Sequence, residues 1–125
     1  MDDNTIRFIN DIDSLTFDKE LKEKNNDYYG IFLCEKIGNN YIQENEGDFN
    51  KVIEIFYGIY DNKKNRIFIR TMAFLSICVI KLRVAKTLDD KKLSKHFAEA
   101  INRCLTILDK LDNKDKDEDS KEEIV

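Results

Sequence analysis

The side chains that could perform catalysis or bind a metal are few and widely spaced in this sequence. There is a single histidine, His96, and a metal site would need a second histidine or paired cysteines to complete it. The cysteines are Cys34, Cys78 and Cys104, and no two of them form a C-x-x-C pair. Ser76 and Cys78 lie in an apolar stretch with no base near them in sequence, so we interpret both as core residues. We therefore expect no enzyme, no catalytic residues, no metal and no cofactor.

Two other patterns that are typical of ligand binding are also missing. Glu44, Glu46 and Asp48 form a local acidic cluster, but their spacing does not match a calcium loop. Helix capping and solvation explain these three residues better. The four glycines are scattered, so no glycine-rich loop can cradle a phosphate.

Charge and cysteine usage limit the class of protein further. The 125 residues suffice for one domain, and 21 Lys and Arg against 25 Asp and Glu give a net charge of -4. An acidic chain is a poor candidate for nucleic acid or an anionic membrane as its main partner. The odd number of cysteines and the N-terminal sequence MDDNTIRF, which has no secretory pattern, predict an intracellular protein with buried thiols.

Hydrophobic periodicity predicts an all-α protein, in agreement with the absence of proline and the presence of only four glycines. We expect helices over residues 3–15, 48–60, 66–88 and 90–111, with Asp48 as an N-cap and an aspartate before the last helix. The third of these segments is apolar nearly all round as far as Lys81, so it should be buried on most sides. Its apolar run is too short to span a membrane.

The stretch from Tyr28 to Glu46 has two interpretations. Cys34, Ile37 and Tyr41 are spaced as on one face of a helix, whereas a glycine-asparagine turn at 38–40 is compatible with a β-hairpin. We favour the helix. The domain is then expected to cover residues 1–111, and the charged residues 112–125 are expected to form a disordered tail.

Four segments resemble, in order, the homology regions of the Bcl-two (B-cell lymphoma two) apoptosis regulators. Residues 70–77, RTMAFLSI, resemble the first homology motif, in which an arginine opens the central helix and an Ala-Phe-x-Ser run follows. Residues 49–56 are similar to the preceding helix, residues 34–41 to the third homology motif, and residues 89–111 to the following amphipathic helix. Small size, the lack of a C-terminal hydrophobic anchor and a composition rich in Lys, Asn and Ile resemble viral members, especially those of AT-rich poxviruses.

The resemblance implies a compact helical bundle around a buried central hydrophobic helix. It also implies a virus-encoded inhibitor of host apoptosis that acts in the host cytoplasm, with homodimer formation left open. The partners would be host pro-apoptotic proteins, whose amphipathic death-motif helices would enter a surface groove. A cation at the groove rim would pair with an aspartate of the incoming helix. The residues expected to line this groove are Tyr41, Val52, Phe56, Arg70, Ala73 and Ile77.

Three alternatives stay open at this stage. The six groove residues could be ordinary core, with Arg70 serving only the start of its helix. Some poxviral relatives have a closed groove and inhibit innate immune signalling through other surfaces. A small acidic protein of a mobile element could instead inhibit a host nucleic-acid enzyme by mimicking the charge of its substrate.

Overall fold

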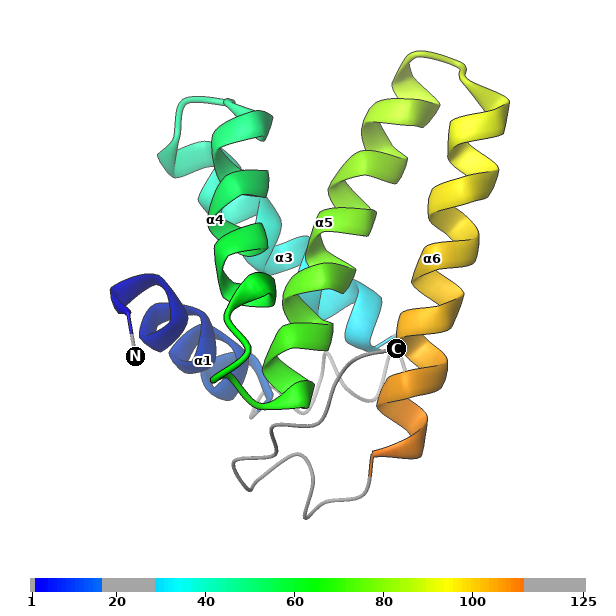
Figure 1. Ribbon diagram of the computed structural model, residues 1–125. Helices are drawn as coiled ribbons and strands as arrows, with labels where there is room; N and C mark the ends of the chain where they lie inside the picture. Colours follow the sequence, from blue (N-terminus) through cyan, green and yellow to red (C-terminus); the bar gives the residue numbers. More distant parts are fainter. Residues whose placement is uncertain (1, 17–28, 112–125) are drawn as a thin grey trace.

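The computed structural model describes residues 2–16 and 29–111, and all regular structure in these ranges is α-helical (Figure 1). The prediction of an all-α protein is thereby confirmed. The predicted tail at 112–125 lies outside the described residues. The helices are α1 (Asp3–Thr16), α3 (Tyr29–Glu44), α4 (Phe49–Asp61), α5 (Ile67–Thr87) and α6 (Lys91–Lys110).

Helix α3 settles the choice between helix and hairpin in favour of the helix. Cys34, Ile37 and Tyr41 are all buried, as the spacing of three and four residues requires for one helical face. Gly38 lies next to the side chain of Ile80, where α3 packs against α5.

Helix α4 begins where the sequence predicts it. The carboxylate of Asp48 accepts a hydrogen bond of 3.1 Å from the Lys51 amide, which confirms the N-cap. The turn before it needs Glu46 and Gly47 in the left-handed region, at φ 58° and 83°. Tyr57 of this helix is 53% exposed, because the apolar stripe is wider than the surface that α5 covers.

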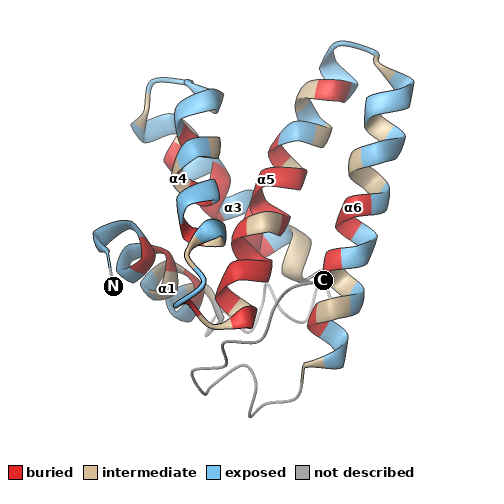
Figure 2. Ribbon diagram, viewed as in Figure 1, coloured by how far each residue is buried: buried red, intermediate tan, exposed pale blue. Residues whose placement is uncertain are grey.

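Helix α5 packs against α3, α4 and α6, which explains why its sequence is apolar on nearly every side. Buried residues follow most of its length in Figure 2, as predicted, and beyond Lys81 only Ala85 of this helix is buried. Thr71 and Ser76 are also buried, and each hydroxyl donates a hydrogen bond to the carbonyl four residues earlier. These two polar groups are therefore satisfied inside the core.

A tight turn joins α5 to α6. Asp89 adopts φ 52°, and the amides of Asp89 and Asp90 donate to the carbonyls of Lys86 and Ala85, which is a Schellman ending. Asp90 then caps α6 by accepting a 3.0 Å hydrogen bond from the Leu93 amide. The two helices consequently run antiparallel and side by side (Figure 1).

Helix α1 packs on α3 and α4 and is capped by Asp2, whose carboxylate accepts from the Thr5 amide at 2.8 Å. Its buried apolar residues are Phe8 and Ile12, whereas Ile6 is 44% exposed.

Candidate functional site

The six residues predicted to line a binding groove are brought into one region, but all six are buried in the core. Their exposed fractions range from 0% for Val52 and Phe56 to 5% for Ile77. Tyr41 stacks on Phe56 with ring centroids 5.1 Å apart, and the ring of Phe8 in α1 also packs against Phe56, at a centroid distance of 5.5 Å. All six side chains are therefore enclosed among the helices in this structure, and their role in partner binding stays a prediction.

Arg70 has a local structural role in the same region. Its Nε donates a 2.8 Å hydrogen bond to the backbone carbonyl of Tyr60, and its guanidinium lies 5.5 Å from the centroid of the Tyr60 ring. Tyr60 belongs to the last turn of α4, where carbonyls have no amide partner within the helix and the helix dipole favours a cation. Arg70 is 4% exposed, so it does not present its charge at a groove rim.

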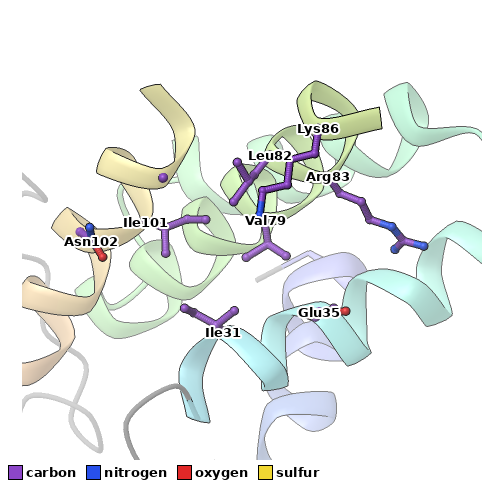
Figure 3. Close-up of a pocket in the computed structure, with 9 residues that line it drawn as sticks. Ile31, Glu35, Val79, Leu82, Arg83, Lys86, Ile101 and Asn102 are labelled. Atoms are coloured by element: carbon purple, nitrogen blue, oxygen red, sulfur yellow. The ribbon is translucent and has the colours of Figure 1, made fainter. Parts of the chain in front are cut away.

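A surface pocket lies elsewhere, where α3, α5 and α6 meet (Figure 3). It encloses about 430 Å³. Its lining combines an apolar floor with charged and polar groups at the edge. The residues are Ile31, Glu35, Val79, Leu82, Arg83, Lys86, Ala98, Ile101 and Asn102.

The pocket is arranged so that opposite charges stand on different helices. Arg83 and Lys86 belong to α5 and Glu35 belongs to α3, and the apolar side chains of Ile31, Val79 and Ile101 lie to one side of Arg83 and Glu35 (Figure 3). Arg83 donates a hydrogen bond to the side-chain oxygen of Asn39, which fixes its guanidinium near α3. An amphipathic segment could therefore bury its apolar face here while an acidic side chain approaches Arg83 or Lys86.

Sequence reasoning missed this pocket because its lining comes from three separate helices. One signal was present: Leu82 and Val84 continue the apolar side of the α5 segment beyond Lys81, where charged residues begin to alternate with apolar ones. Apolar side chains that continue beyond the core of a helix mark a candidate contact surface.

The cysteines take no part in this pocket. All three are free and buried, as predicted. Burial raises the pKa of Cys34 to about 12, so its thiol stays protonated at neutral pH. In residues 2–16 and 29–111, no group of three or more His, Cys, Asp or Glu side chains is arranged to hold a metal ion.

Two further findings bear on the class of protein. No helix in the described part of the chain is long and apolar enough to cross a membrane. No family model, curated protein or solved structure matches this chain.

Proposed function

We propose that this protein is a Bcl-two-like inhibitor that sequesters an amphipathic death-motif helix of a host pro-apoptotic protein in the host cytoplasm. The proposal rests on the order of the four motif-like segments and on an all-helical fold. The observation that carries it is the open apolar pocket between α3, α5 and α6, with Arg83 and Lys86 at its edge. The incoming helix occupies this pocket, and the buried residues around Arg70 support the fold that forms it.

The interaction has two physical parts. Val79, Leu82 and Ile31 are half-buried in the free protein, so a partner helix removes their remaining apolar surface from water. Arg83 is exposed, so its pairing with an acidic residue of the partner sets orientation and association rate more than affinity.

The test is titration of a panel of death-motif peptides against the wild-type protein and matched leucine variants. Leu82→Ala should weaken the binding of a recognised peptide about tenfold, because most of one leucine side chain no longer contributes apolar contact. Leu93→Ala is the control, since Leu93 is 43% exposed on α6 and does not line the pocket. Equal affinity of both variants would exclude the pocket as the binding site.

A second candidate function is supported by the burial of all six predicted groove residues. A closed groove is the feature by which the resemblance distinguishes relatives that inhibit innate immune signalling. If no death-motif peptide binds at micromolar concentration and the protein suppresses a host-cell reporter of innate immune signalling, this second function replaces the first.

A further inference from the structure

The end of α5 and the start of α6, on either side of a turn that contains Asp89 and Asp90, concentrate positive charge in a protein that is acidic overall. Residues 81–95 contain six Lys or Arg and two Asp, a net charge of +4, whereas the whole chain carries -4. All six basic side chains are exposed. The sequence-based expectation that the chain has no basic footprint therefore fails locally, because the net charge averages an acidic body with one basic end.

The same end carries apolar side chains that the fold leaves uncovered. Leu88, in the turn, is 70% exposed, and Leu93, in the first turn of α6, is 43% exposed. They are two of the five large hydrophobic residues described as exposed, and only these two stand among clustered lysines. We call Leu88, Lys91, Lys92, Leu93 and Lys95 the basic tip.

The position of the basic tip in the fold distinguishes it from a groove. It lies at the outer end of the α5–α6 pair, where exposed residues predominate (Figures 1 and 2). Helix α6 packs chiefly on α5, and the turn is held rigidly by the Schellman ending and the Asp90 cap. A projecting turn cannot surround a partner helix, but it can approach an extended flat surface.

We propose that the basic tip docks the protein onto an anionic phospholipid surface. The lysines lie close to the lipid phosphates and carboxylates, and their aliphatic stems extend along the headgroup layer. Leu88 and Leu93 enter the boundary between headgroups and acyl chains, where burial of apolar surface is favourable. A nucleic acid would satisfy the lysines equally, but it would leave both leucines in water, so the combination favours lipid.

This surface is separate from the floor of the pocket between α3, α5 and α6, so the proposal does not depend on the proposed function. Docking by the basic tip would hold the protein at a membrane without a spanning segment. The binding is reversible and weakened by salt, because exposed charges supply most of the attraction.

The experiment is co-sedimentation of the full chain with vesicles of phosphatidylcholine, with and without phosphatidylserine. Binding is expected only to the vesicles that contain phosphatidylserine, and it should fall as salt is added. Replacing Lys91, Lys92 and Lys95 with serine should lower the partition coefficient about 100-fold. The matched control replaces Lys36, Lys51 and Lys64 with serine, which removes the same charge from exposed positions on α3, on α4 and before α5.

A second pair of variants tests the apolar part of the basic tip. Leu88→Ser with Leu93→Ser should weaken binding without changing its salt dependence, and circular dichroism verifies that each variant is folded. The proposal is overturned if the control triple variant loses as much binding as the tip variant, or if phosphatidylcholine alone binds equally. It is also overturned if the leucine variant binds like wild type, or if a short oligonucleotide displaces the protein from the vesicles at stoichiometric concentration.

Discussion

Replacing Arg70 with alanine is expected to destabilise the fold before it affects any partner. The Nε of Arg70 donates a hydrogen bond of 2.8 Å to the Tyr60 carbonyl in the last turn of α4, and the Arg70 side chain is almost completely enclosed. Alanine cannot supply this donor, so the carbonyl is left without its partner in a region with little access for water. The contact between the guanidinium and the Tyr60 ring is lost as well.

The size of the effect follows from these two contacts. A hydrogen bond from a charged donor contributes about 1.5–3 kcal/mol, and a largely desolvated cation–π contact contributes about 0.5–2 kcal/mol. Because both contacts involve Tyr60 and are not independent, we expect a loss of about 2–4 kcal/mol in the free energy of unfolding. A domain of this size is stable by about 5–15 kcal/mol, so the variant should remain folded but melt at a clearly lower temperature.

Urea unfolding followed by far-ultraviolet circular dichroism measures this loss. Arg83→Ala is the matched control, since it also removes one arginine from α5, but at an exposed position with a hydrogen bond to exposed Asn39, where the cost should stay below about 1 kcal/mol. If the free energy of unfolding of Arg70→Ala lies within about 0.5 kcal/mol of the wild-type value, Arg70 does not stabilise the end of α4 as proposed.

Three further predictions concern a cap, a phenol and a thiol. Asp90→Ala should cost about 1 kcal/mol in thermal unfolding, because the Leu93 amide loses its acceptor at the start of α6. Burial, and next its hydrogen bond to Asp11, raises the pKa of Tyr41. The contribution of Tyr41 to the free energy of unfolding is therefore complete below about pH 10 and is lost progressively as the pH rises above that value. In urea titrations, Tyr41→Phe should lose less of its free energy of unfolding at alkaline pH than the wild type does. The raised pKa of Cys34 predicts that this thiol resists a disulfide reagent at about pH 8 until urea unfolds the chain, and rapid labelling of Cys34 in the native protein would refute this.

The sequence was sufficient to predict the features that depend on local periodicity and capping. The helical face of Cys34, Ile37 and Tyr41 favoured helix over hairpin, and Asp48 was recognised as an N-cap from residue type and position. Periodicity does not report which part of an apolar stripe a neighbouring helix covers, and Tyr57 of α4 is half exposed although it continues the apolar stripe of that helix.

The contacts between helices could not be predicted from local periodicity and capping residues. Arg70 and Tyr60 are only ten residues apart, but their contact exists because the turn at residues 62–66 directs the start of α5 back along the end of α4. The pocket depends in the same manner on the angle at which α3 crosses the α5–α6 pair. Hydrophobic pattern alone fixes neither of these arrangements.

Asn65 links parts of the chain that are distant in sequence, and this has a consequence for the order of folding. Its side-chain amide donates to the Ile59 carbonyl at 2.9 Å and to the Thr5 hydroxyl at 3.4 Å. The first contact closes a short loop, whereas the second requires a residue sixty positions away, and long loops close more slowly. The α5–α6 pair, joined by a tight turn, can form early from local contacts. We therefore expect α1 to dock last during refolding, and its amides to exchange with solvent sooner than those of α5.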